Sequence, residues 1–154
     1  MHTLGHAIRR GTVFFALLVA SGAVAFAGAT IMPNGDLRIP KKEVTTAVKF
    51  YQYKSGGVLM EVLALRAPDG SVRTAFNTCQ VCYSSGRGYY TQKGDYLVCN
   101  NCGNRFLASQ VELIKGGCNP VPITKDLKFE DANFITIPRA ILDEAKPLFL
   151  KWKR

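Results

Sequence analysis

Alternating apolar and polar positions dominate the middle of the chain and predict short antiparallel strands. The run TAVKFYQYK (46–54) alternates and is rich in β-branched and aromatic residues, and the turn SGG separates it from VLMEVLALRA (58–67). A second turn, PDG, leads into SVRTAF (71–76), so these runs predict a β-meander. The middle run carries apolar residues at odd and even positions, which predicts a central strand buried on both faces.

Further short strands are predicted downstream, followed by a single helix near the end of the chain. GYYTQ, DYLVC and RFLAS have strand composition, and a turn at Gly94 and Asp95 separates the first two. FITIPRAILDEAKPLFLKW (134–152) predicts a short strand, then an amphipathic helix that begins at Pro138 and is interrupted or ended by Pro147. The expected fold is mainly β, a meander of short antiparallel strands with a cysteine-rich double-knuckle insert, plus a short C-terminal helix.

The N-terminal segment has the sequence of an export signal. Arg9 and Arg10 precede an uncharged apolar run from Gly11 to about Ala29, for which we expect a hydrophobic helix. An A-x-A sequence ending at Ala27 suits cleavage of a signal peptide, but the run is also nearly long enough for an uncleaved membrane anchor. Both alternatives place the rest of the chain on the extracytoplasmic side, because the arginines tend to stay in the cytoplasm.

Composition and charge allow one modest domain after this segment. Residues 30–44 hold two prolines, an Asn-Gly pair and a Lys-Lys pair without an apolar period, which predicts a linker or an irregular lead-in. The predicted organisation is a signal peptide or signal anchor over 1–29, a linker over 30–44 and one domain over 45–154.

The net charge of +9 comes from basic residues that are scattered along the chain except in the tail KPLFLKWKR. A solvated basic face, with anionic lipid as one candidate neighbour, is therefore favoured over a nucleic-acid interface.

Four of the five cysteines form two C-x-x-C pairs with the spacing of a four-thiolate metal site. Cys79 and Cys82 make the first pair and Cys99 and Cys102 the second, with 16 residues between the pairs. A C-x-x-C turn places two sulfurs on one side of a tight loop, and two such loops that face each other supply a tetrahedron. The pattern predicts a metal site without specifying the metal.

The residues that follow the two pairs differ. Gly103 directly follows Cys102 and fits a knuckle in which backbone N–H groups point at a thiolate and the chain takes a positive φ. Tyr83 takes the corresponding place after the first pair, and the next glycines are Gly86 and Gly88. The first loop therefore departs from the pattern of the second.

The fifth cysteine and the neighbouring tyrosines each have more than one interpretation. Cys118, in KGGCNPVPI, is either a buried small residue on a turn or a further or alternative ligand, or else a partner for one of the pairs. Tyr83, Tyr89, Tyr90 and Tyr96 flank the pairs. We interpret them mainly as strand packing, and otherwise as a cover that limits solvent access to the site.

The absence of histidine after the apolar run excludes several kinds of metal site and catalytic site. The two histidines are His2 and His6, which excludes Cys/His zinc fingers, Rieske-type centres, type-1 copper sites and histidine-dependent catalysis in the exported part. Haem attachment through C-x-x-C-H also fails. A thioredoxin-like pair opens a helix, whereas CQVCYSSGRG continues into turn residues. Outside the cytoplasm, thiol pairs either form disulfides or are protected by a metal.

Five segments follow one another along the chain: FYQY, LALRAPDGSVRTAFNTCQVCY, GRGYY, GDYLVCNNCGNRF and KGGCNPVPI. In these segments the chain resembles the FtrD-like family of membrane iron-sulfur-containing proteins, and the resemblance covers roughly residues 46 to 137. It implies an extracytoplasmic, membrane-tethered domain with an iron-sulfur or other redox-active metal centre, associated with a bacterial iron-uptake permease and a periplasmic iron-binding protein. The ligands that it implies are Cys79, Cys82, Cys99, Cys102 and Cys118.

The leading functional hypothesis is an electron-transfer or metal-handling accessory rather than a hydrolase or transferase. Its cofactor would be an iron-sulfur cluster or a single iron, and with one candidate spanning segment the chain fits an outer-face electron carrier. One alternative is a structural zinc ribbon that holds together an interaction module, because a small loop-rich segment needs such a staple. Another is binding or delivery of Cu(I), which soft thiolates suit.

Overall fold

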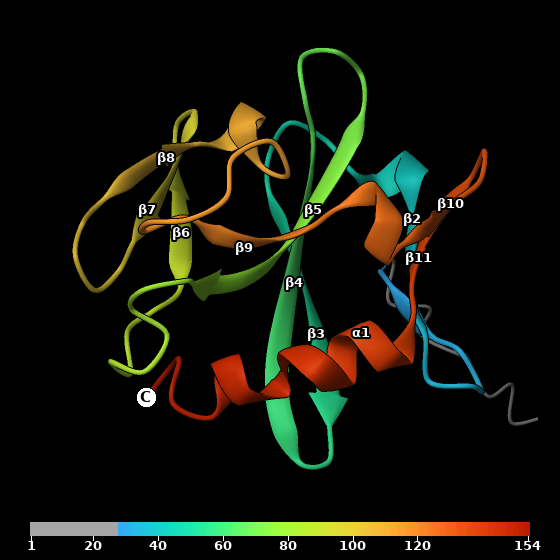
Figure 1. Ribbon diagram of the computed structural model, residues 1–154. Coiled ribbons are helices and arrows are strands. Elements are labelled where there is room, and N and C mark those ends of the chain that lie inside the picture. The colour runs from blue at the N-terminus through green and yellow to red at the C-terminus, as the bar shows by residue number, and fades with distance from the viewer. Residues whose placement is uncertain (1–27) are drawn as a thin grey trace, which may run out of the picture.

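The computed structural model describes residues 28–154. The expected N-terminal hydrophobic helix therefore lies outside the described residues. Within them, three antiparallel sheets and one α-helix form three layers, with the longest strands in the middle (Figure 1). The prediction of a mainly β fold with a short C-terminal helix is confirmed. No helix in this part of the chain has both the length and the apolar character needed to cross a membrane.

The central sheet contains the predicted meander and one strand from farther along the chain. Its strand order is β3-β4-β5-β9, and all pairings are antiparallel. β4 lies between two partners and is buried on both faces for most of its length, which confirms that it is a central strand. The strands are β3 (Lys49–Ser55), β4 (Val58–Arg66), β5 (Val72–Cys79) and β9 (Pro120–Ile123).

A second sheet packs on one face of the central sheet, in the order β1-β2-β11-β10. Its strands are β1 (Thr30–Ile31), β2 (Leu37–Pro40), β10 (Phe129–Glu130) and β11 (Phe134–Ile137). Residues 30–44, expected as a linker or irregular lead-in, thus contribute two strands and the 3-10 helix η1 (Lys41–Glu43). β2 is ordered because Leu37 and Ile39 are buried in the core and its backbone pairs with β11.

The C-terminal helix lies across the same face. α1 (Arg139–Ala145) begins directly after Pro138, whose carbonyl accepts the first helical hydrogen bonds, and it continues into the 3-10 helix η4 (Lys146–Phe149). Pro147 has no N–H to donate, which explains why the α-helical ladder ends there. The predicted start at Pro138 and interruption at Pro147 are both confirmed.

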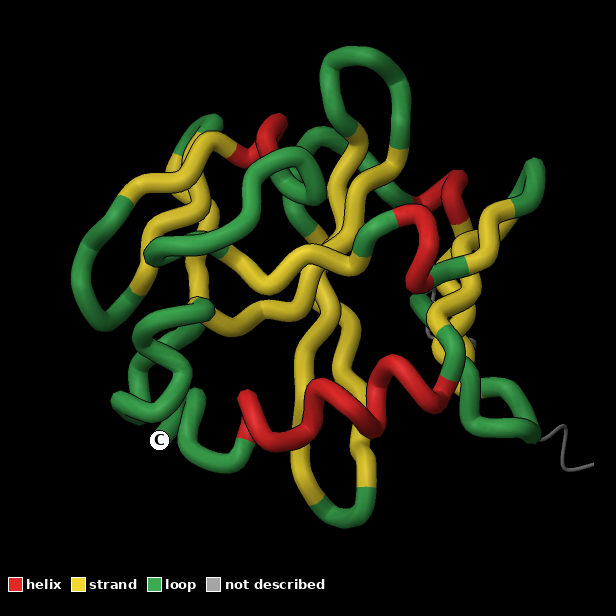
Figure 2. Tube along the Cα trace, viewed as in Figure 1, coloured by secondary structure: helices red, strands yellow, loops and turns green. Residues whose placement is uncertain are grey.

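A small third sheet covers the other face of the central sheet. It consists of β6 (Tyr90–Lys93), β7 (Tyr96–Cys99) and β8 (Arg105–Leu107), in that order. Long loops join β5 to β6 and β8 to β9 (Figure 2), and the second loop contains η2 (Ala108–Gln110). A further 3-10 helix, η3 (Lys125–Leu127), follows β9. The central sheet thus separates two clusters of buried side chains, and three of the five cysteines are buried in the cluster beneath the third sheet.

Candidate metal centre

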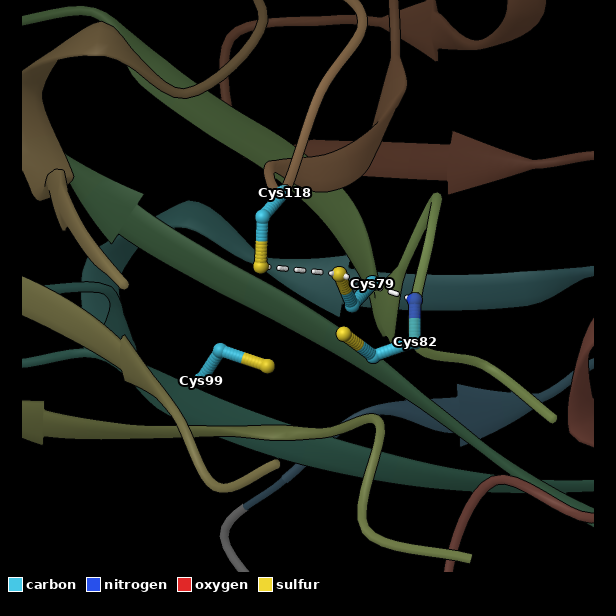
Figure 3. Close-up of side chains that lie close together, drawn as sticks. All are labelled: Cys79, Cys82, Cys99 and Cys118. Carbon is cyan, nitrogen blue, oxygen red and sulfur yellow. Dashed lines mark hydrogen bonds between the residues drawn. The ribbon is translucent and has the colours of Figure 1, made fainter. Parts of the chain in front are cut away.

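Four cysteine sulfurs converge where the central and third sheets meet. The Sγ atoms of Cys79, Cys82, Cys99 and Cys118 all lie within 4.8 Å of one another, and Figure 3 shows the side chains directed toward a common point. Cys79 ends β5, Cys99 ends β7, and Cys118 lies in the loop before β9. Cys79, Cys82 and Cys99 are buried, whereas Cys118 is partly exposed.

The remaining cysteine lies at the rim of this group. Cys102 is exposed, and its Sγ is 2.9 Å from Sγ of Cys118. The structure therefore gathers all five predicted ligands, but the compact group of four contains Cys118 and leaves Cys102 on the solvent side. This placement fits the interpretations in which Cys118 is a ligand or a partner for one of the pairs, rather than a small residue buried on a turn.

Each C-x-x-C pair forms a tight loop that turns backbone N–H groups toward its first sulfur. In the first loop the N–H of Cys82 donates to Sγ of Cys79 over 3.3 Å. In the second loop the N–H groups of Asn101 and Cys102 donate to the sulfur of Cys99. Gly103 has the predicted positive φ, 75°. Hydrogen bonds of this kind stabilise the negative charge of a thiolate.

The first loop depends on a glycine that comes six residues after its second cysteine. A Cβ atom added to Gly88 would lie 2.2 Å from the carbonyl oxygen of Cys82 and 2.7 Å from Cα of Tyr83. The carbonyl oxygen of Gly88 also accepts a hydrogen bond of 2.8 Å from the N–H of Cys79. Gly88 thus allows the chain to pass directly against the first loop as it leaves that loop. The sequence did not predict this role, since it showed only that this glycine comes well after the cysteine pair.

The loop that carries Cys118 is fastened to both knuckles. The side-chain amide of Asn104 donates to the carbonyl oxygen of Cys118 over 2.9 Å. Gln80, inside the first pair, accepts from the N–H of Gly116 over 3.2 Å and donates to the carbonyl oxygen of Pro120 over 3.3 Å. These amides hold the three cysteine-bearing segments together, and no motif in the sequence distinguished them.

A buried ion pair holds the start of the same loop. The carboxylate of Glu112 accepts hydrogen bonds from the backbone and hydroxyl of Thr74 on β5 and forms an ion pair with Lys128. Glu112 has a φ of 69°, a strained value for a residue with a side chain. The contacts of its carboxylate therefore offset both the strain and the burial of the Lys128 ammonium group.

One of the four flanking tyrosines lies against the sulfurs. Tyr90 is buried, and its hydroxyl is 3.9 Å from Sγ of Cys118 and also hydrogen bonds with the thiol of Cys79. Tyr89 instead packs edge-to-face on Trp152, and Tyr96 lies beneath the guanidinium of Arg105. Tyr90 therefore fits the interpretation in which a tyrosine covers the site and limits solvent access to it.

Burial makes charged thiolates unfavourable at three of the converging positions. It raises the pKa of Cys82 to about 11, and it also raises the pKa values of Cys99 and Cys118. A buried thiolate is costly unless a positive charge lies beside it. The buried part of the group is therefore suited to surround a cation.

Hydrogen bonding lowers the pKa values of the other two thiols. At Cys102 the hydrogen bond with Cys118, followed by one from the N–H of Asn104, lowers the pKa to about 7. At Cys79 burial favours a higher pKa, but hydrogen bonds from the Tyr90 hydroxyl and from backbone N–H groups outweigh it and lower the pKa. The group therefore contains both thiols poised to ionise and thiols that need a cation to do so.

The spacing of the sulfurs indicates what the group can hold. A tetrahedral ion with metal–sulfur bonds of about 2.3 Å places its four sulfurs about 3.8 Å apart, which fits within the observed limit of 4.8 Å. The donor chemistry suits iron, an iron-sulfur cluster, zinc and Cu(I). In a cluster the thiolates bind different iron atoms and lie farther apart, so the compact spacing fits a single ion most closely.

Comparison with known families explains why these cysteines occur together. The model of a family described as "Membrane iron-sulfur containing protein FtrD-like" matches residues 44–149, which include every cysteine of the chain. The chain belongs to the FtrD-like family. Neither the curated proteins nor the solved structures contain a match. Membership and the cysteine group together support metal binding, with an iron-sulfur centre as the family's description has it.

Proposed function

We propose that this FtrD-like protein is an extracytoplasmic, membrane-associated electron-transfer or metal-handling protein with a thiolate-bound iron centre. The observation that carries the proposal is the convergence of four cysteine sulfurs within 4.8 Å, three of them buried. Iron bound by thiolates supplies one-electron chemistry without a change of ligands. The family's description supports iron, and the sulfur spacing supports a single iron more directly than a cluster.

The protein's own residues have defined roles in this proposal. Cys79, Cys82, Cys99 and Cys118 hold the iron, while Tyr90 and the knuckle N–H groups donate hydrogen bonds to the sulfurs. Such hydrogen bonds stabilise the more negative, reduced form and so raise the reduction potential. Because Cys102 is exposed and in contact with Cys118, its side of the site is where an electron would enter or leave.

The proposed partners come from the sequence rather than from the geometry. The family resemblance connects such domains with an iron-uptake permease and periplasmic iron-binding components, and the N-terminal sequence suits export. The protein would then pass single electrons on the periplasmic or outer face while a partner changes the oxidation state of iron in transit.

A structural zinc site is the second candidate, favoured by the same compact spacing. Structural zinc sites are closed and tetrahedral, and a four-cysteine set fastened by backbone hydrogen bonds is typical of them. In that case the metal would hold the third sheet against the central sheet. Its loss would then affect stability rather than electron transfer.

Anaerobic purification of the full chain in detergent separates these functions. We expect one iron per chain without acid-labile sulfide, an EPR signal of oxidised mononuclear iron, and reversible bleaching by one electron equivalent. Iron with sulfide would retain the redox function but replace the single iron by a cluster. One zinc per chain in a colourless, redox-inactive protein would refute the electron-transfer proposal, and copper with an ultraviolet thiolate band would favour Cu(I) delivery instead.

A further inference from the structure

The geometry points to a lipid-binding face at the opposite end of the central sheet from the β4–β5 turn. We infer that the tip of the β3–β4 hairpin and the C-terminal tail together dock on an anionic bilayer surface. We call this surface the hairpin–tail face and define it by residues 54–59 and 146–153. The inference is independent of the metal and of the proposed redox function.

An apolar hollow forms the middle of the hairpin–tail face. It has a volume of about 480 Å³ and is lined by Gly57, Val58, Leu59, Phe149, Leu150, Trp152 and Lys153. Leu59 and Leu150 are 45% and 66% exposed. In Figure 1 the hairpin tip and the tail, in red, both lie at the bottom of the molecule. Two exposed leucines beside a shallow hollow suit insertion at the boundary between lipid headgroups and acyl chains.

Lysines surround this hollow. Lys54 is directly opposite Leu59 in the β3–β4 register, and Nζ of Lys146 lies beside Gly56 at the hairpin turn. Lys151 is exposed in the tail. Lysines at the edge of an apolar patch place their charges at the level of lipid phosphates while the apolar side chains enter the membrane.

Two acidic groups beside this face are paired with neighbouring residues. Glu61 accepts hydrogen bonds from Asn77 and Lys153, and Asp143 accepts them from Ser55 and Arg139. Residues 54–59 and 146–153 themselves contain four lysines and no acidic residue, so the charge of the face is positive. This positive charge complements an anionic bilayer and disfavours a neutral or basic surface as the occupant of the face.

The sequence outside the described residues supports the same occupant. The uncharged apolar run from residue 11 to about residue 29 directly precedes the described chain, and the family is described as a membrane protein. A membrane-tethered chain could thus present this face to the lipid.

The position of the only tryptophan gives a direct test. Trp152 lines the hollow, so its fluorescence reports contact between this face and lipid. The full chain is reconstituted into vesicles of phosphatidylcholine alone or of an equal mixture with phosphatidylglycerol, with and without brominated acyl chains. We expect bromine to quench Trp152 in the anionic vesicles and high salt to reverse the quenching, since salt screens the lysines.

Charge variants decide whether the face itself docks. Combining Lys54→Gln, Lys146→Gln and Lys151→Gln should lower the ratio of docked to undocked molecules by about five-fold per lysine, or on the order of a hundred-fold in total. A matched triple variant at exposed lysines elsewhere should leave the quenching unchanged. Its substitutions are Lys42→Gln, Lys93→Gln and Lys125→Gln.

Apolar variants complete the test. Leu59→Ser with Leu150→Ser should abolish quenching, whereas Leu113→Ser with Phe129→Ser, at similarly exposed positions, should not. Thermal unfolding of each variant checks that the fold is intact. The inference is overturned if folded variants quench like the original chain, if quenching is equal in neutral vesicles, or if none occurs in any vesicle.

Discussion

Replacing Gly88 by alanine tests whether the first knuckle is built as the structure shows. The added Cβ atom would lie 2.2 Å from the carbonyl oxygen of Cys82 and 2.5 Å from its carbonyl carbon. Both atoms belong to the backbone of a short loop that ends in a ligand, so they cannot move away as a flexible side chain would. Gly88 is not among the glycines with positive φ, which means that the effect comes from the close approach alone.

The size of the effect follows from this geometry. Overpacking in a well-packed interior costs about 1 to 3 kcal/mol, and contacts with rigid backbone belong at the upper end of that range. A loss of about 3 kcal/mol lowers the midpoint of thermal unfolding by roughly 10 °C in a domain of this size. Metal content should fall as well, because relief of the clash moves Cys82 away from the other sulfurs.

The assay is thermal unfolding followed by circular dichroism, together with metal content per chain. Gly94→Ala is the control, since Gly94 has a φ of 58° but nothing within 4 Å of its added Cβ. That substitution should cost about 1 kcal/mol through backbone strain and leave metal binding intact. If Gly88→Ala were as stable as Gly94→Ala and kept its full metal content, the described packing of the first loop would be wrong.

Three further predictions concern the sulfurs and the loop that delivers Cys118. Cys118→Ser should lose most of the bound metal while Cys102→Ser retains it, measured as metal per chain; equal losses would contradict the inner group of four. Tyr90→Phe keeps the packing but removes a hydrogen bond to sulfur, so a redox titration should give a lower reduction potential; an unchanged potential would exclude that role. Glu112→Gln should lower the free energy of unfolding in urea by about 3 to 5 kcal/mol, because it leaves the Lys128 ammonium group buried without a counter-charge. Adding Lys128→Met should restore part of that loss, and no recovery would argue against the pair.

Local patterns were sufficient to predict the meander, the strands of the third sheet, β11 and the two knuckles. The mixed apolar pattern of residues 58–67 identified β4 as a strand with partners on both sides, because only such a strand buries both of its faces. Gly103 was predicted to have a positive φ because of its place directly after a cysteine, and it does. These features depend on a few neighbouring residues, which is why one sequence is enough to find them.

Pairing between strands far apart in the sequence determines the features that the sequence analysis could not predict. Cys118 reaches the site because β9 pairs with β5 and places Pro120 opposite Cys79, a contact between segments far apart in the chain. β2 is likewise stabilised by β11, almost a hundred residues away, and its four residues are too few to show a period. Among the tyrosines, the register of β6 with β7 places Tyr90 opposite Cys99. Spacing alone contains none of this information.

The division of the interior by the central sheet has a consequence for how metal is gained and lost. The larger cluster, which includes Leu37, Ile135 and Phe149, is built from side chains that need no metal to pack. We expect this half to fold first and to bring β5 and β9 together, so that the thiols are gathered before an ion arrives. Loss of the ion would then loosen one half of the molecule while the other keeps its structure as a template for reloading.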